Sequence, residues 1–213
     1  MQAFFSPDGI FSRVMNFIWD LIWVSILWLV CCVPIVTIGA SSLSAYYTMA
    51  KVVRHKTGQV TREFFGSFRR NFKQATILTL FFGVILAILF VDCVYVYSIP
   101  EFPLWSLYLF YLLILVGLAD TMYIWPCLSR FDMKNTALCK MTTILLFRHL
   151  LTTILLLLLL AATLIGIFLM PWGILIFPGL MFYLQTYLME RILLRYSPKP
   201  EEGDPEAEKW YYQ

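Results

Sequence analysis

The stretch LLTTILLLLLLAATLIGIFLM, Leu150–Met170, contains 21 consecutive residues without a charged side chain. A helix of about 20 apolar residues crosses the roughly 30 Å hydrocarbon core of a bilayer. The whole chain has a similar character, because 61% of its 213 residues are hydrophobic and only 14% are charged. Soluble domains carry about 25% charged residues. The composition therefore indicates a membrane protein and excludes a soluble enzyme or a secreted disulfide scaffold.

Four other apolar runs predict further membrane-spanning helices. They cover residues 16–33, 75–97, 104–128 and 172–189. The last of these is interrupted by Pro178 but is otherwise apolar. Only Pro171, Trp172 and Gly173 separate it from the run 150–170. Such a short connection predicts that these two helices form an antiparallel hairpin.

The stretch PIVTIGASSLSAYYTMAKVV, Pro34–Val53, leaves the number of spans open at five or six. Its serines and threonines lower its hydropathy, which favours an interfacial or re-entrant segment. Its length, its lack of charge before Lys51 and its many small residues instead favour a helix packed inside a bundle. We interpret residues 36–53 as a sixth span that is covered by protein.

These patterns predict an all-α fold, namely a polytopic transmembrane helix bundle with five or six spans within residues 1–196. The last segment, 197–213, reads SPKPEEGDPEAEKWYYQ and contains three prolines and five acidic residues. Such a composition cannot bury a core, so we expect a short disordered tail.

The distribution of basic residues predicts the orientation of the chain. Seven Lys and Arg residues lie between residues 39 and 74, four between 129 and 149, and four after 189. The expected loops 98–103 and 171–173 contain none. The positive-inside rule therefore places the three basic segments and the C-terminus in the cytoplasm. Six spans would also place Arg13 on that side, whereas five would place it outside.

The segment TREFFGSFRRNFKQ, Thr61–Gln74, predicts a cytoplasmic amphipathic helix. Phenylalanines recur at helical spacing and basic residues flank them. The residues concerned are Phe64, Phe65, Phe68, Arg69, Arg70, Phe72 and Lys73. An aromatic stripe with a basic flank is typical of a helix that lies among lipid headgroups. The same pattern would also suit docking on another membrane subunit or on a cytoplasmic ATPase, and the sequence does not separate the two.

Asp120 is the deepest ionisable residue in the predicted spans. It lies about eight residues, or roughly 12 Å of helix, from the cytoplasmic end of the run 104–128. Ionisable groups at this depth are costly and often functional. Asp120 therefore needs a partner, a water-filled cavity or a proton. Arg148, at the start of the next span, is a candidate partner, although it could equally extend to the headgroups.

The chain lacks the motifs of the common catalytic and metal sites. Neither a Gly-rich nucleotide loop nor a GxSxG or HExxH sequence occurs. The five cysteines form no CxxC pair and suit apolar packing. We therefore expect a protein that is not an enzyme and has no cofactor, no metal and, at a net charge of +3, no nucleic-acid partner.

Several short motifs resemble one family of bacterial membrane proteins. They are Pro34-Ile-Val-Thr37-Ile-Gly39, Ala45-Tyr46-Tyr47, Phe64-Phe65, Ser67-Phe68 through Thr76, Trp125-Pro126, Arg130-Phe131-Asp132 and Arg148-His149-Leu150. Together they resemble the YesL-like family of small integral membrane proteins. That resemblance implies a multi-pass protein of the bacterial plasma membrane, typical of Gram-positive bacteria. It also implies an association with carbohydrate-uptake ABC transporters, because such genes and those for glycoside-degrading enzymes accompany the family.

Three functions are therefore open. The first, favoured by the resemblance, is a non-enzymatic accessory protein of a carbohydrate ABC import system, in contact with permease subunits or the ATPase through cytoplasmic basic elements. The second is a membrane-embedded regulator or sensor. The third is a small homo-oligomeric solute transporter with Asp120 at its polar centre.

Overall fold

The computed structural model describes residues 10–98 and 104–197. All the regular secondary structure in this part of the chain is helical. The predicted disordered tail, 197–213, lies outside the described residues except for Ser197. The elements in chain order are α1 (Ile10–Cys32), η1 (Ile35–Thr37), α2 (Ile38–Thr48), η2 (Met49–Arg54), α3 (Val60–Ser98), α4 (Leu104–Arg130), α5 (Asn135–Arg148), α6 (Leu150–Leu169), η3 (Pro171–Leu175) and α7 (Phe177–Tyr196). The all-α prediction is therefore confirmed.

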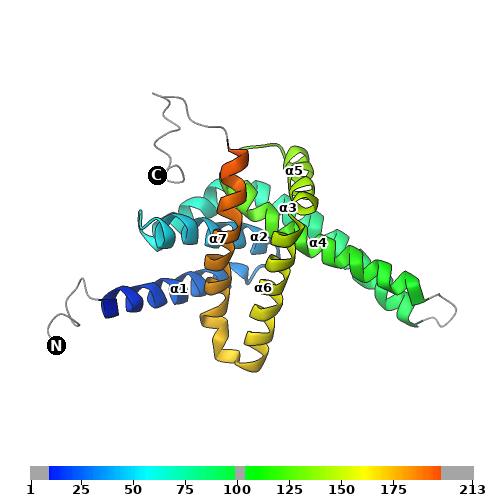
Figure 1. The fold of residues 1–213 in the computed structure, drawn as a ribbon, viewed down its shortest axis with the longest axis horizontal. Coiled ribbons are helices and arrows are strands. Elements are labelled where there is room, and N and C mark those ends of the chain that lie inside the picture. The colour runs from blue at the N-terminus through cyan, green and yellow to red at the C-terminus, as the bar shows by residue number, and fades with distance from the viewer. Residues whose placement is uncertain (1–9, 99–103, 198–213) are drawn as a thin grey trace.

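Helix α2 is the centre of the fold. It contacts α1, α3, α4 and α7 (Figure 1), and every residue from Gly39 to Ala50 is buried. Its small side chains allow the neighbouring helices to approach closely. At Gly39 the approach is closest, because an added Cβ would overlap the side chains of Thr79 on α3 and Trp125 on α4.

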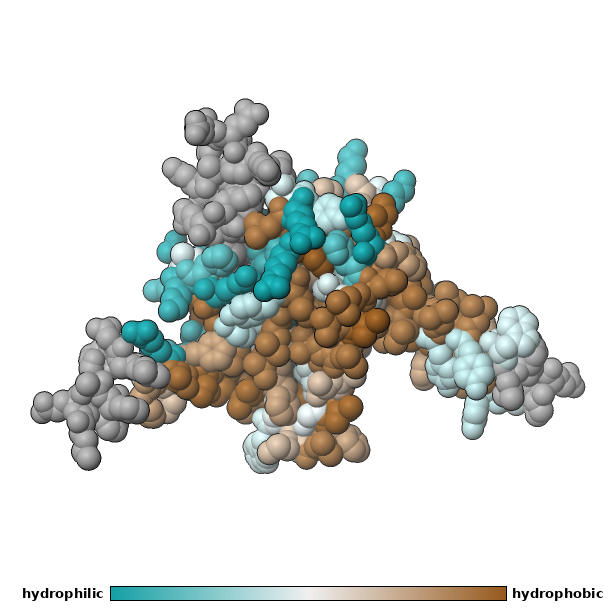
Figure 2. All heavy atoms as spheres, viewed as in Figure 1, coloured by the Kyte–Doolittle hydropathy of each residue, from teal (hydrophilic) through white to brown (hydrophobic). Residues whose placement is uncertain are grey.

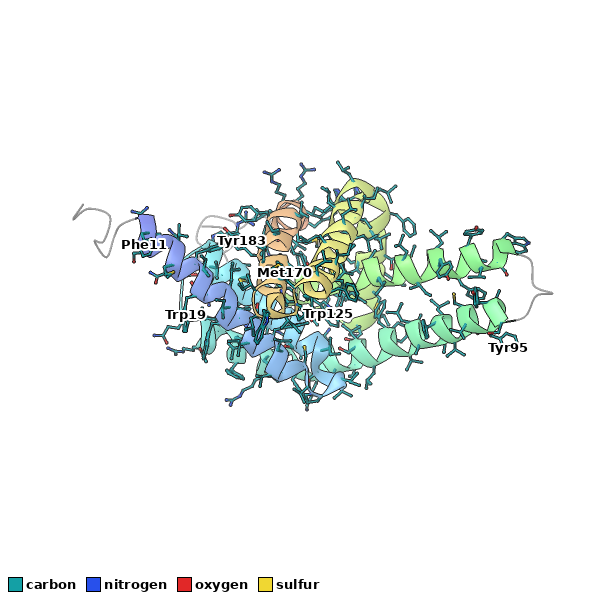
Figure 3. The ribbon with its side chains drawn as sticks, turned by 90° about the horizontal axis from the view of Figure 1, so that it is seen from below. Phe11, Trp19, Tyr95, Trp125, Met170 and Tyr183 are labelled. Atoms are coloured by element: carbon teal, nitrogen blue, oxygen red, sulfur yellow. The ribbon has the colours of Figure 1, made fainter. Side chains whose placement is uncertain are left out.

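Three apolar arms leave this centre. Helix α1 extends to one side, the α6–α7 hairpin extends downward, and α3 and α4 run together to the other side (Figures 1 and 3). We call residues 84–98 and 104–116 the α3–α4 arm. Its exposed large side chains include Val84, Ile88, Phe90, Val91, Tyr108, Leu112 and Leu115. Such continuous exposed apolar surface suits contact with the lipid bilayer.

Four helices are long and apolar enough to cross a membrane, namely α1, α3, α4 and α6 within the part of the chain described. The structure does not establish a count of five or six spans. The predicted span 36–53 is broken into η1, α2 and η2, and its α-helical part has only 11 residues. The predicted span 172–189 corresponds to η3 and α7, where Gln185 and Glu190 interrupt the apolar pattern. The α6–α7 hairpin does form as expected (Figure 1).

Helix α3 joins two segments that the sequence analysis treated separately. It has 39 residues and is therefore about 58 Å long, nearly twice the thickness of a bilayer core. The amphipathic segment 61–74 forms its first part and the apolar run 75–97 its second. Its start is tied to α1, because the Trp23 indole N–H donates to the Thr61 hydroxyl at 2.8 Å.

Helix α5 is an element that the sequence analysis did not predict. Its inner face is formed by Leu138, Thr142, Leu145 and Leu146, which are all buried. These residues recur at the i, i+4, i+7 and i+8 spacing of an amphipathic helix. With the C-terminal end of α7, α5 lies at the end of the molecule where hydrophilic side chains gather (Figures 1 and 2). We call this end, formed by α5 and the C-terminal end of α7, the polar face.

Candidate functional site

Three helices meet at a buried ionic cluster formed by Tyr46, Arg130 and Glu190. The Arg130 guanidinium on α4 forms an ion pair with the Glu190 carboxylate on α7, and each side chain is only 3% exposed. The Tyr46 hydroxyl on α2 donates to Glu190 Oε1 at 2.9 Å. One carboxylate thus accepts from a cation and a phenol on two other helices. Because the desolvated carboxylate is neutralised and hydrogen-bonded, it fastens α2, α4 and α7 together.

Further polar contacts hold α7 in the same place. Arg54 Nη1, at the end of η2, donates to the Thr186 carbonyl at 2.8 Å. Its guanidinium lies 4.7 Å from the centre of the Tyr187 ring, within the range of a cation–π contact. Gln185 Nε2 donates to the Met122 carbonyl on α4 at 2.8 Å. Gln185, Thr186 and Tyr187 of α7 therefore contact the protein's own neighbouring elements.

The hydroxyl groups of the α2 region are also used internally. Ser41 donates to the Trp28 carbonyl at 3.0 Å, and the Trp28 indole N–H donates to Ser42 at 3.1 Å. Ser44 and Thr48 donate to the carbonyls four residues before them, each at 2.7 Å. The polarity that left this segment uncertain in the sequence is thus satisfied within a buried helix.

The structure does not bring Asp120 and Arg148 together. The Asp120 side chain is buried, at 7% exposure, and its Oδ2 accepts a long hydrogen bond of 3.4 Å from Thr143 on α5. Arg148 lies at the far end of α5 with its guanidinium 5.7 Å from the centre of the Tyr196 ring. The suggested ion pair is therefore not formed, because Arg148 packs toward α7 and the polar face.

The aromatic and basic residues of segment 61–74 are divided between the core and the surface. Phe64 is fully buried, and its ring stacks on that of Phe68 at 6.4 Å between centroids. Phe65 and Phe72 are exposed, as are Arg69, Arg70 and Lys73. The Arg70 guanidinium also lies 5.6 Å from the centre of the Tyr47 ring. Phe64 therefore packs inside the protein and Phe68 lies half-buried against the core, whereas the other residues of the set remain accessible to a headgroup or a partner.

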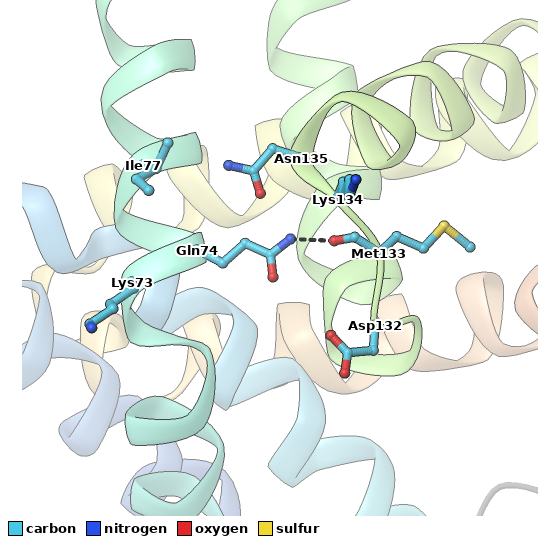
Figure 4. Close-up of a pocket in the computed structure, with 7 residues that line it drawn as sticks. All are labelled: Lys73, Gln74, Ile77, Asp132, Met133, Lys134 and Asn135. Carbon is cyan, nitrogen blue, oxygen red and sulfur yellow. Dashed lines mark hydrogen bonds between the residues drawn. The ribbon is translucent and has the colours of Figure 1, made fainter.

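A hollow opens between α3 and the α4–α5 connection. It has a volume of about 610 Å³ and is lined by Lys73, Gln74, Ile77, Asp132, Met133, Lys134 and Asn135 (Figure 4). Gln74 Nε2 crosses from α3 to donate to the Met133 carbonyl at 2.7 Å. The hollow is bordered by lysines and by Ile77, which begins the exposed apolar surface of α3. We call it the α3–α5 hollow.

Burial affects the pKa values of three basic residues, namely Lys51, His55 and His149. Burial lowers the pKa of His55, and the neighbouring Arg54 lowers it further. Burial likewise lowers the pKa of His149, with added repulsion from Arg148 and Arg195. For Lys51, burial is the largest single effect and acts to lower the pKa, but the hydrogen bonds and charges of Glu63 and Tyr47 together outweigh it, so the pKa is raised. Both histidines are therefore mostly neutral at pH 7, so Lys and Arg supply the positive charge.

No group of three or more His, Cys, Asp or Glu side chains suited to a metal occurs among the residues that the structure describes.

The comparisons with known proteins concern the first part of the fold. No curated protein and no solved structure matches the chain. A family match covers residues 21–93, which include Tyr46 of the ionic cluster but neither Arg130 nor Glu190. This stretch, from α1 to the α3–α4 arm, matches the family described as "Protein of unknown function, DUF624".

Proposed function

We propose that this protein is a non-enzymatic accessory subunit of a carbohydrate ABC import system in the bacterial plasma membrane. Its polar face contacts a permease loop or the ATPase, and its apolar arms contact lipid or permease helices. The carbohydrate and ABC parts of this proposal rest on the YesL-like resemblance of the sequence.

The observation that carries the proposal is that the polar groups at the centre of the fold bind other groups of the same protein. A transport pathway needs polar side chains that are free to bind solute. The hydroxyls of Ser41, Ser44 and Thr48 donate to backbone carbonyls. Glu190 pairs with Arg130 and accepts a hydrogen bond from Tyr46. The polar groups of the centre thus hold the fold together, which favours an interaction protein over a transporter.

The basic residues of α3 and the α3–α5 hollow offer the surface that such a protein needs. The exposed residues Arg69, Arg70 and Lys73 lie on the first part of α3, and Lys73 also lines the α3–α5 hollow. Basic residues around a hollow of about 610 Å³ suit an acidic or amphipathic segment of a partner, because charge complementarity steers association and fixes orientation.

Co-purification tests this proposal. The tagged protein, extracted from native membranes in mild detergent, is expected to recover an ABC permease or ATPase that mass spectrometry identifies. The double variant Lys73→Glu/Lys134→Glu is expected to lower that recovery about tenfold, the equivalent of about 1.4 kcal/mol of binding free energy, because it reverses the charge of the hollow.

The matched control is Arg62→Glu/Lys140→Glu, which makes the same charge change at exposed residues outside the lining of the hollow. It is expected to keep most of the recovery. Absence of any permease or ATPase from the wild-type sample would contradict the proposed function. Equal losses in both double variants would show that the hollow is not the contact.

The proposed orientation can be tested by labelling with a membrane-impermeant maleimide. Lys134→Cys on the polar face is expected to react only after the cells are permeabilised. Trp172→Cys, at an exposed position in η3, is expected to react in intact cells. The native chain, with its five free cysteines, provides the background signal. The reverse pattern would place the polar face and the C-terminus outside the cell.

A further inference from the structure

Asp120 has an unusual environment for an acidic residue. It lies on α4 ten residues before Arg130, or about 15 Å along the helix axis, within a span of α4 that is apolar enough to cross the membrane. The residue is 7% exposed. Its Oδ1 atom is buried and has no hydrogen-bond partner among the described residues.

The hydroxyl groups beside Asp120 satisfy it poorly. Thr143 approaches Oδ2 at 3.4 Å, but the same hydroxyl is 2.9 Å from the Cys139 carbonyl. The Thr142 hydroxyl faces the carboxyl group as well, and it donates to the Cys139 carbonyl at 3.0 Å. Each of these threonines has one proton to donate, and both protons are directed mainly to the backbone.

Among residues 10–98 and 104–197, no cation forms an ion pair with this carboxyl group. The next charged residue along α4 is Arg130, which is paired with Glu190. On α5, Arg148 lies over Tyr196 and Lys140 is exposed. Within the part of the chain that the structure describes, the titratable groups that interact with the charge of Asp120 are the thiols of Cys127 on α4 and Cys139 on α5, and neither carries positive charge. A bare carboxylate in such a place costs several kcal/mol, which a protein avoids by neutralising the group.

We propose that Asp120 is an intramembrane proton-binding site, framed by Thr142 and Thr143, and that the native protein carries one proton on this carboxyl group at neutral pH. The proton comes from the aqueous phase and is bound at a carboxylate oxygen, so no other bond changes. A proton needs no additional space and converts a buried acceptor into a neutral group that can donate. Its loss would place a negative charge between α4 and α5. The inference is independent of the proposed accessory function.

Infrared spectroscopy of the full chain in lipid nanodiscs at pH 7 tests the proposal. At this pH exposed carboxyl groups are ionised, since their pKa values lie near 4. The difference spectrum of wild type minus Asp120→Asn is expected to contain the carbonyl band of a protonated carboxyl group, which shifts in D₂O. The control Asp132→Asn, at an exposed position in the α4–α5 connection, is expected to remove only carboxylate bands.

Two outcomes would overturn the proposal. Carboxylate bands in the Asp120 difference spectrum would show that the group is ionised. Carboxylate bands that change when NaCl replaces choline chloride would identify a bound metal cation in place of the proton. Should Asp120→Asn fold poorly, the wild type can still overturn the proposal, because the absence of any D₂O-sensitive protonated carboxyl band at pH 7 would show that Asp120 is ionised.

The unfolding temperature gives a second measure. The native state is expected to bind one proton more than the unfolded chain at neutral pH. The free energy of unfolding therefore falls as the pH rises, over the range in which the Asp120 carboxyl group is ionised in the unfolded chain but protonated in the native state. Asp120→Asn imitates the neutral group and is expected to remove this decline. An equal decline in the wild type and in Asp120→Asn would assign it to other groups and contradict the proposal.

Discussion

Glu190→Leu is expected to lower the free energy of unfolding by about 3–5 kcal/mol, because it leaves the Arg130 charge buried without its partner. The pair is only 3% exposed on each side, so water cannot compensate for the lost carboxylate. The variant also removes the acceptor of the Tyr46 hydroxyl. Unfolding in detergent micelles, followed by circular dichroism over a denaturant series, measures the loss.

Two further variants show whether the loss comes from the uncompensated charge. Removing all three polar groups, in Glu190→Leu/Arg130→Met/Tyr46→Phe, is expected to recover most of the stability, because apolar residues of similar volume often replace a buried ion pair without a net cost. Glu63→Leu breaks the Lys51–Glu63 pair, whose side chains are 21% and 22% exposed. It is expected to cost less than about 1 kcal/mol. Similar losses for Glu190→Leu and Glu63→Leu would contradict the assigned role of the cluster.

Gly179→Ala is expected to destabilise the fold by about 1–3 kcal/mol, the usual cost of overpacking. The added Cβ would overlap the Leu21 carbonyl oxygen and would lie 2.7 Å from Ser25 Oγ. The Gly179 N–H also donates to this serine hydroxyl at 2.8 Å. Because the obstacle includes the backbone of α1, the contact between α1 and α7 must open.

Gly83→Ala on α3 is the matched control, since among the described residues nothing beyond its chain neighbours and the local helix backbone lies within 4 Å of the added Cβ. It is expected to stabilise the helix by up to about 1 kcal/mol through its better helix propensity. The same chemical change should therefore have opposite signs at the two glycines, as measured by their unfolding midpoints. A loss at Gly83 as large as that at Gly179 would show that the close approach of α1 and α7 is not the cause.

Hydropathy predicted the helices whose surface is uniformly apolar and failed for those with mixed surfaces. The runs 104–128 and 150–170 correspond closely to α4 and α6, because lipid-facing helices need apolar residues on most sides. Helix α5 was missed because polar residues separate its buried positions. The segment 36–53 was ambiguous because its hydroxyls bond to carbonyls inside a buried helix, an arrangement that a hydropathy scale does not register.

The candidate sites were predictable only where one residue carried the signal. The depth of Asp120 in its apolar run identified it, whereas its neighbour Thr143 comes from a helix that the sequence analysis did not predict. The ionic cluster was missed because Tyr46 and Glu190 are 144 positions apart. One signal was present, since Glu190 is the sole acidic residue between 172 and 196, and such a residue in an apolar helix requires a partner.

The continuity of α3 has a mechanical consequence. The helix contains no proline, the residue that most often introduces a sharp bend. Its contact with Gly39 falls at Thr79, which is 19 residues from Val60 and 19 from Ser98. Helix α4 packs along α3 as well, so the two helices of the α3–α4 arm are joined to the Thr61 end by one unbroken rod. A displacement of that end, through Trp23 or through a protein bound beside it, would therefore be transmitted along α3 to the arm.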